Sequence, residues 1–189
     1  MRLIVPAYIA GAGVNDGGCK MMEILALQQQ MINYMGGDAR RIQHFIKVHA
    51  FAKMIGTMEK LPPETQYTLE VAALTHDIGI RMGEKKYGAD MVNGKVQEQE
   101  GPAEAKKMLE ALGCALQVIE RVCFLIGHHH TFESIEGLDY QILVEADFLV
   151  NLYEDGLPLE NVQTALTKIF KTPSGIKLCE TMFGLKKTE

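Results

Sequence analysis

Apolar residues recur along this chain with the period of an α-helix, and this pattern limits the fold more than any other feature. Strict alternation of apolar and polar residues, which marks a half-buried strand, is almost absent. Glycines and prolines divide the helical pattern into segments of ordinary helix length. We therefore expect an all-α fold with helices over about 19–35, 38–58, 63–79, 98–112, 115–126, 139–153, 159–170 and 174–183.

The sequence suits a single domain. Its 189 residues are 47% apolar and 23% charged, which is the profile of a globular protein. We expect residues 1–18 to form a loose N-terminal arm and residues 19–189 to form one helical bundle. The apolar stretch 3–14 is interrupted by Pro6 and two glycines and is shorter than the roughly 18 residues that span a bilayer, so we expect no membrane segment.

Charge and cysteine content argue against some classes of partner. The formal net charge is −5, whereas nucleic-acid polymers and anionic membrane surfaces both attract proteins with a basic field. The four cysteines lack CxxC spacing, and free thiols of this kind predict a reducing, cytoplasmic setting. We expect a small molecule as partner, and the sequence leaves room for a homo-oligomer.

One histidine lies on the inner face of the 38–58 helix. His44 shares a stripe with Val48 and Ile55, and should point into the core. His49 lies about 140° further around the helix, at 3.6 residues per turn. We expect His49 to be a surface residue, or one that supports the site without entering it.

Two further segments place ionisable residues where burial is expected. LEVAALTHDIG, at 69–79, delivers His76 and Asp77 side by side at the end of an apolar helix, and Asp147 lies inside the apolar run QILVEADFLVNLY. A buried carboxylate without a partner would destabilise the fold by roughly several kcal/mol. Imidazole nitrogen and carboxylate oxygen together suit Mn, Fe, Co, Ni or Zn, so a divalent metal accounts for both burials.

The order of these residues resembles the HD superfamily, which is defined by a histidine, a distant His-Asp doublet and a distant aspartate. The matching text is RIQHFIKV at 41–48, AALTHDIG at 72–79 and EADFLVN at 145–151, within a core region of 38–154. The resemblance implies a helical bundle and a metal-dependent phosphohydrolase. It also implies four metal ligands: His44, His76, Asp77 and Asp147.

Some members of this superfamily add histidines that hold a second metal. LIGHHHT, at 125–131, places three imidazoles at a helix end, and the preceding apolar pattern favours His129, then His128, then His130. The alternative is a solvated cluster in a loop. Where a further histidine often precedes this stretch, the chain has QEQEGP, in which Glu100 is preferred to Glu98 as a ligand. The sequence therefore leaves open whether the site binds one metal ion or two.

Residues 80–97 contain three glycines and several charges, and we expect a long surface loop there. Its cations can bind phosphate beside a metal, although a charged loop can also be merely solvated. Arg41, one turn before His44, is a further candidate. The candidate substrate-binding residues of the loop are Arg81, Lys85, Lys86 and Lys95.

The leading hypothesis is hydrolysis of a small phosphate ester or nucleotide by a metal-activated water, with Asp77 orienting the nucleophile. Three alternatives stay open. The first is a di-iron oxygenase of the HD-like helical type, which iron content and oxygen uptake would distinguish. The second is a metal-binding sensor without activity. The third is a purely structural role, which would require an arginine partner for Asp147.

Overall fold

The computed structural model describes residues 22–185, and the all-α prediction is confirmed within that range. The expected N-terminal arm, residues 1–18, lies outside the described residues. The elements are α1 (Ile24–Tyr34), α2 (Ala39–Met58), α3 (Pro63–Thr75), α4 (Gly79–Tyr87), the short 3₁₀ turn η1 (Ala89–Met91), α5 (Gly94–Ala111), α6 (Leu116–Ile126), α7 (Leu138–Glu154), α8 (Leu159–Lys168) and α9 (Pro173–Phe183).

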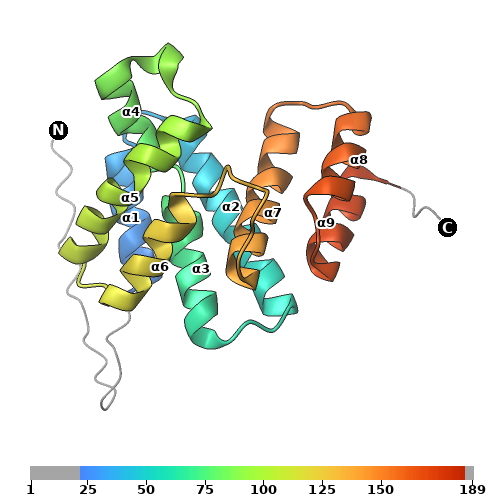
Figure 1. Ribbon diagram of the computed structural model, residues 1–189, viewed down its shortest axis with the longest axis horizontal. Helices are drawn as coiled ribbons and strands as arrows, with labels where there is room; N and C mark the ends of the chain where they lie inside the picture. Colours follow the sequence, from blue (N-terminus) through green and yellow to red (C-terminus); the bar gives the residue numbers. More distant parts are fainter. Residues whose placement is uncertain (1–21, 186–189) are drawn as a thin grey trace, which may run out of the picture.

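Helix α3 lies in the middle of the bundle, where it contacts α1, α2, α6 and α7. Helix α2 packs along both α3 and α7, and α5 packs on α4 and α6. Helices α8 and α9 contact each other at one end of the molecule beside α7, away from α4 and α5 (Figure 1). The elements that carry the predicted ligands therefore come together around α3.

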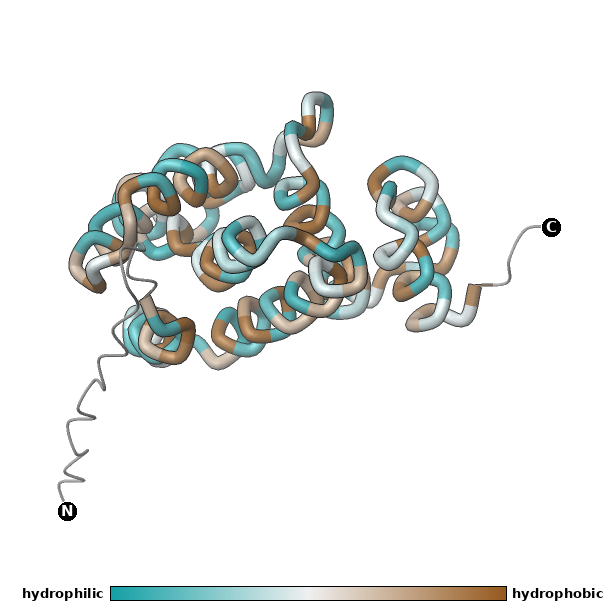
Figure 2. Tube along the Cα trace, turned by 90° about the horizontal axis from the view of Figure 1, so that it is seen from below, coloured by the Kyte–Doolittle hydropathy of each residue, from teal (hydrophilic) through white to brown (hydrophobic). Residues whose placement is uncertain are grey.

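The core is formed by the inner faces of these helices. Brown and teal segments alternate along each helix in Figure 2, as expected for helices with one buried face. Burial of each large apolar side chain contributes about 1.5–3 kcal/mol, so this core fixes the ligand-bearing helices relative to one another. Fully buried members from α2, α3, α6 and α7 include Phe45, Leu74, Leu125, Ile126 and Tyr140.

Short polar side chains cap the N-termini of several helices. Asp38 accepts a hydrogen bond from the backbone N–H of Arg41 at 3.0 Å, as expected for the N-cap of α2. Asn93 caps α5 in the same way, by accepting from the N–H of Val96 at 3.1 Å. The cap at Asp38 fixes the start of α2, the helix that carries His44.

The expectation of a loop over 80–97 is wrong. The segment contains most of α4, the turn η1 and the first residues of α5. Gly79 and Gly83 lie within α4 and do not break it. Because they lack a side chain, α4 and α5 can pack closely. A Cβ on Gly79 would lie 2.6 Å from the carbonyl oxygen of Gln97, and one on Gly83 would lie 2.8 Å from a methyl carbon of Val96.

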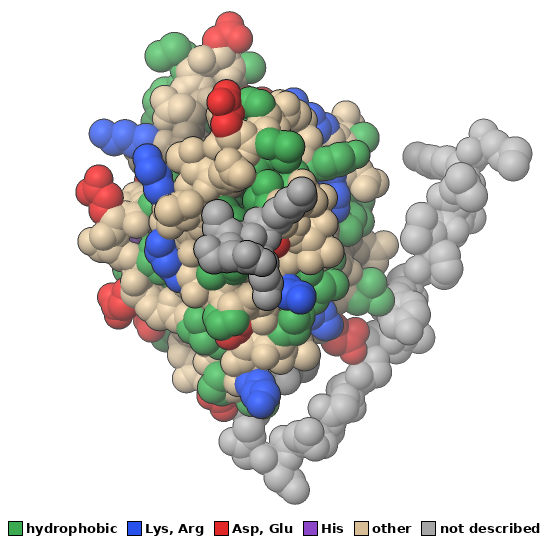
Figure 3. Space-filling view, turned by 90° about the vertical axis from the view of Figure 1, so that its right-hand side faces the viewer, with side chains coloured by type: hydrophobic (Ala, Val, Ile, Leu, Met, Phe, Trp, Pro, Cys, Tyr) green, Lys and Arg blue, Asp and Glu red, His purple; other side chains and the backbone are tan. Residues whose placement is uncertain are grey.

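The surface carries charges of both signs. On the face at the α8–α9 end, acidic and basic side chains are interspersed, without a continuous basic area (Figure 3). No helix among residues 22–185 is both long and apolar enough to cross a membrane.

Candidate metal centre

Histidines and carboxylates from three places in the chain meet beside the core. His44 comes from the inner face of α2, His76 and Asp77 from the turn between α3 and α4, and Asp147 from the middle of α7. The turn after α3 is held in place because Gly79 lets α5 cross directly behind it, with the backbone nitrogen of Gly101 only 2.6 Å from where a Cβ would stand. Local sequence thus delivers the His-Asp doublet to the interior.

The ligating atoms of these residues lie within contact distance of one another. His44 Nε2 is 3.2 Å from His76 Nε2, 3.1 Å from Asp147 Oδ1 and 3.6 Å from Asp77 Oδ2. His76 Nε2 is 3.5 Å from both carboxylates. His76 is almost completely buried, and the other three side chains are largely buried. This first group offers two nitrogen and two carboxylate ligands to one point.

A second group shares Asp77 with the first. One atom each of Asp77, His129 and His130 lie within 4.8 Å of one another. Asp77 Oδ1 is 3.8 Å from His129 Nε2, while Asp77 Oδ2 faces the first group. The two oxygens of Asp77 therefore face different groups, as a carboxylate that bridges two ions would.

The hydrogen bonds on the outer side of the rings determine what the inner side presents. His76 Nδ1 lies 2.9 Å from the carbonyl oxygen of Ala73, and His129 Nδ1 lies 2.7 Å from that of Ile126. A carbonyl only accepts, so both Nδ1 atoms must donate, and in a neutral ring Nε2 then carries a lone pair. His129 Nε2 is buried and has no hydrogen-bond partner among the described residues.

Lone pairs and carboxylate oxygens therefore converge without a donor of their own. His44 fits the same pattern, because its Nδ1 lies 3.0 Å from a carboxylate oxygen of Glu154 and its Nε2 faces inward. Such an arrangement of buried acceptors is unfavourable unless a cation or protons lie between them. Nitrogen and carboxylate ligands in this number suit a divalent transition metal, so the residues fit the predicted cofactor.

The same proximity perturbs the acidity of the metal-free groups. Burial raises the pKa of Asp77 and Asp147, but the neighbouring histidines outweigh it and hold both values well below the usual range. Burial lowers the pKa of His76, whereas Asp77 and Asp147 outweigh it and raise the value to about 9. Burial and the nearby His129 lower the pKa of His130 to about 4, which keeps that ring neutral and able to ligate.

The model of the HD domain family matches residues 41–169, which include every residue of both groups. The chain belongs to the HD domain family. A solved structure with a similar fold is a predicted HD superfamily hydrolase from an uncultured Thermotogales bacterium, with a TM-score of 0.58 and 24% sequence identity. The similarity covers 85% of this chain and 83% of that chain. No curated protein matches this sequence significantly.

The four residues that the HD resemblance selected are the ones that form the first group. The structural alternative required an arginine partner for Asp147. Among residues 22–185, the basic side chains within 4 Å of that carboxylate are His44 and His76, and no arginine is among them.

The second group differs in part from the sequence expectation. His129 takes the predicted place, but the sequence ranked His128 above His130 and the structure reverses that order. His128 is exposed, stacks on Phe124 and bonds through Nδ1 to the carbonyl oxygen of Phe124 at 2.7 Å. The turn after α6, not the helical period, decides which ring points inward.

Neither glutamate is brought into the two ligand groups. Glu100 is buried, as a ligand would be, but its carboxylate pairs with Lys86 and accepts a hydrogen bond from the Tyr87 hydroxyl at 2.9 Å. Glu98 instead accepts from the backbone N–H of His130 at 2.9 Å, and so supports the turn that presents that ring. Lys86 is accordingly engaged in an ion pair with Glu100.

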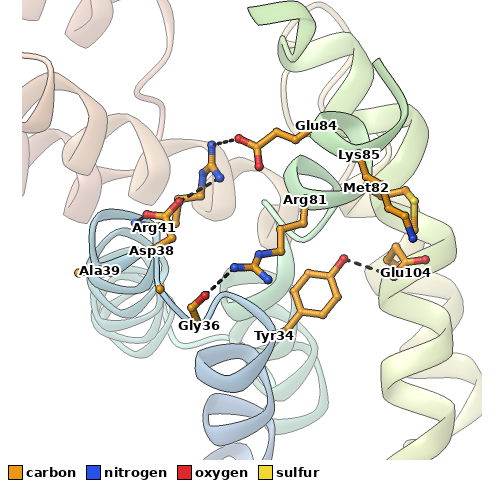
Figure 4. Close-up of a pocket in the computed structure, with 11 residues that line it drawn as sticks. Tyr34, Gly36, Asp38, Ala39, Arg41, Arg81, Met82, Glu84, Lys85 and Glu104 are labelled. Carbon is orange, nitrogen blue, oxygen red and sulfur yellow. Dashed lines mark hydrogen bonds and ion pairs between the residues drawn. The ribbon is translucent and has the colours of Figure 1, made fainter. Parts of the chain in front are cut away.

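The cations proposed to bind phosphate divide into two sets. Arg81 and Lys85 line a pocket of about 980 Å³ between the α1–α2 turn, α4 and α5 (Figure 4). Arg41 lines it as well, and pairs with Asp38 and Glu84 at 2.9 and 2.7 Å. Lys86 and Lys95 are not among the lining residues, and Lys95 is exposed.

His49 lies outside the metal groups, as its helical position predicts. Of the two alternatives for this residue, a surface position is wrong. His49 is buried, and its Nε2 lies 3.1 Å from Glu70 Oε2. Glu70, placed on the facing side of α3, provides the polar partner that makes this burial possible.

Glu154 was not selected from the sequence, although a signal for it exists. It follows Asp147 by seven residues, about two turns, and so lies on the same face of α7.

Proposed function

We propose that this HD-domain chain is a metal-dependent phosphohydrolase that acts on a small phosphate ester or nucleotide. The observation that carries the proposal is the convergence of buried imidazole nitrogens and carboxylates on two points that share Asp77. Family membership and the similarity to a predicted HD superfamily hydrolase support hydrolysis as the reaction class.

The residues of the two groups would have two roles, which are to bind metal ions and to orient a water molecule. His44, His76, Asp77 and Asp147 would hold one ion, and Asp77, His129 and His130 a second. A bound divalent ion would supply Lewis acidity, which lowers the pKa of water from 15.7 toward about 7. Asp77, with an oxygen toward each group, is placed to accept a hydrogen bond from the attacking water and to orient it toward phosphorus.

The polar pocket of Figure 4 is the proposed place for the remainder of the substrate. It begins one helical turn beyond Asp77, because Arg81 follows that residue by four positions on α4. Arg81 keeps donors beyond the single bond that it makes to the carbonyl oxygen of Gly36 at 2.6 Å. Lys85 adds a second cation to the same pocket, whereas Arg41 is already paired with two carboxylates. Arg81 and Lys85 are therefore the proposed partners of an anionic substrate besides the metal.

A di-iron oxygenase is a second candidate, because two adjacent groups that share a carboxylate would also suit a pair of irons. Its basis is the buried Nε2 of His129, which has no hydrogen-bond partner among the described residues and is free to bind a second ion. The second group alone does not separate the two reactions.

The two candidates differ in their need for oxygen. Protein loaded separately with Mn, Co, Ni and Fe should be assayed under argon against a panel of small phosphoesters and nucleotides, with the metal content of each sample counted. Phosphate release without oxygen supports the hydrolase. No release with any metal, together with oxygen uptake by the iron-loaded sample, would replace it with the oxygenase.

A further inference from the structure

A carboxylate stands behind one of the ligand histidines. Glu154, in the last turn of α7, places Oε2 3.0 Å from Nδ1 of His44, on the side of the ring opposite the metal group. Its other oxygen contacts the ammonium group of Lys47. The Glu154 side chain is only 11% exposed, so this contact is held within the protein and not merely at its surface.

The other two ligand histidines that bond outward through Nδ1 have a different kind of partner. His76 and His129 both donate from Nδ1 to a backbone carbonyl, of Ala73 and Ile126 respectively. His44 is therefore the one of these three that is backed by a charged acceptor.

A carboxylate in this position has two effects on a ligand histidine. It fixes the proton on Nδ1, so that the lone pair of Nε2 points to the metal, and its negative charge makes Nε2 a stronger donor to the metal. Outer partners of this kind typically change metal affinity by about 10–100-fold when they are removed.

The neighbouring lysine completes the arrangement. Lys47 lies three residues after His44 on α2, so one turn of that helix presents both groups to the same carboxylate. Its ammonium group contacts the second oxygen of the carboxylate, and this positive charge favours the ionised form of Glu154.

We propose that Glu154 is a positioning residue that holds His44 in the Nδ1–H form and thereby strengthens metal binding by His44, His76, Asp77 and Asp147. This proposal rests on the metal centre of the proposed function, but it does not depend on which reaction that centre performs.

A neighbouring ion pair provides a matched control. Asp155 follows Glu154 directly and pairs with Arg40 of α2 at 3.2 Å, so it links the same two helices through an exposed carboxylate. Asp155→Asn therefore removes the charge of an α2–α7 ion pair without touching a ligand.

The test compares Glu154→Ala, Glu154→Gln and Asp155→Asn by the affinity of metal-depleted protein for Co²⁺ and Zn²⁺, measured by competition with a chromophoric chelator. Glu154→Ala should weaken binding about 10–100-fold. Glu154→Gln retains an acceptor oxygen but loses the charge, so it should bind more weakly than the wild type and more tightly than the alanine variant. Asp155→Asn should change affinity less than about twofold.

A spectroscopic readout separates positioning from a merely structural role. The visible absorption of the Co²⁺-saturated protein reports the ligand field, and it should shift in both Glu154 variants but not in Asp155→Asn. If Glu154→Ala fails to fold, Glu154→Gln, which keeps the volume and the acceptor, provides the same comparison.

The proposal is overturned if both Glu154 variants bind Co²⁺ as tightly as the control with unchanged spectra, or if Asp155→Asn loses as much affinity as they do. Neither measurement requires turnover. A wild type that binds metal tightly and depends on Glu154, but releases no phosphate, would leave this inference standing and remove the phosphohydrolase.

Discussion

Replacing Gly79 with alanine should damage the metal centre through packing alone. The added Cβ would lie 2.6 Å from the carbonyl oxygen of Gln97, 2.6 Å from the backbone nitrogen of Gly101 and 2.9 Å from the Cα of Gly101. These neighbours are backbone atoms of α5, which cannot rotate away as a side chain can. Overpacking of this kind costs about 1–3 kcal/mol.

Gly83→Ala is the matched control, since both glycines lie in α4 and face α5. The Cβ added at Gly83 would meet side-chain carbons of Val96 at 2.8 Å and Val92 at 3.2 Å, and these can shift. Alanine also favours a helix interior over glycine by up to about 1 kcal/mol, a gain that Gly79, as the first residue of α4, realises less. Gly83→Ala should therefore be nearly neutral.

Thermal unfolding of the metal-free variants measures the packing effect. At about 2–4 °C per kcal/mol for a chain of this size, Gly79→Ala should lower Tm by about 2–12 °C relative to wild type. Because Gly79 follows Asp77 by two residues, the same shift of backbone should displace that carboxylate and weaken metal binding. Equal Tm values and equal metal affinity for the two variants would refute the argument that close helix packing positions the doublet.

Three further tests, two of them with a control substitution, examine separate parts of the structure. His129→Ala should reduce the number of ions bound per chain at saturation and His128→Ala should not, as counted by elemental analysis, because only the former ring faces Asp77. Lys85→Ala should raise KM several-fold for the best phosphoester with unchanged metal content, whereas Lys95→Ala, outside the pocket, should alter neither. Burial, partly offset by Glu70, lowers the pKa of His49, so the unfolded chain binds the extra proton and stability is lost as pH falls below about 6.5 toward that lowered value. His49→Gln should flatten this acid side of the profile of Tm against pH, and an unchanged slope would show that His49 is not the group responsible.

The helical period of the sequence predicted the fold class and the inward direction of single side chains. Helical period places His44 toward the core, and an apolar context around Asp147 makes an unpaired carboxylate costly. The four residues come from segments up to about a hundred positions apart, so their meeting depended on the family resemblance. Helical periodicity alone predicts the direction of a side chain, but it does not predict which residue of another helix that side chain contacts.

The incorrect expectations arose where a contact between helices decides the outcome. The glycines of 80–97 suggest a loop, but Gly83 lies inside α4, where Val96 of α5 packs closely against it. Glu100 lies at a buried position, as a ligand would, yet Lys86 from α4 neutralises it. The sequence shows that Glu100, Lys86 and these glycines are present, but it does not show which of them lie in contact.

Glu154 could be found from the sequence by helical spacing, once Asp147 is taken as a ligand. After Asp147 is placed on the inner face of α7, the residue two turns later must lie on that same face, and a carboxylate there needs a partner. Two basic groups on the facing helix, His44 and Lys47, are spaced to provide it. A search for outer partners of ligand histidines can therefore begin from helical spacing, and the distance of 3.0 Å from Nδ1 to Oε2 selects the carboxylate that binds.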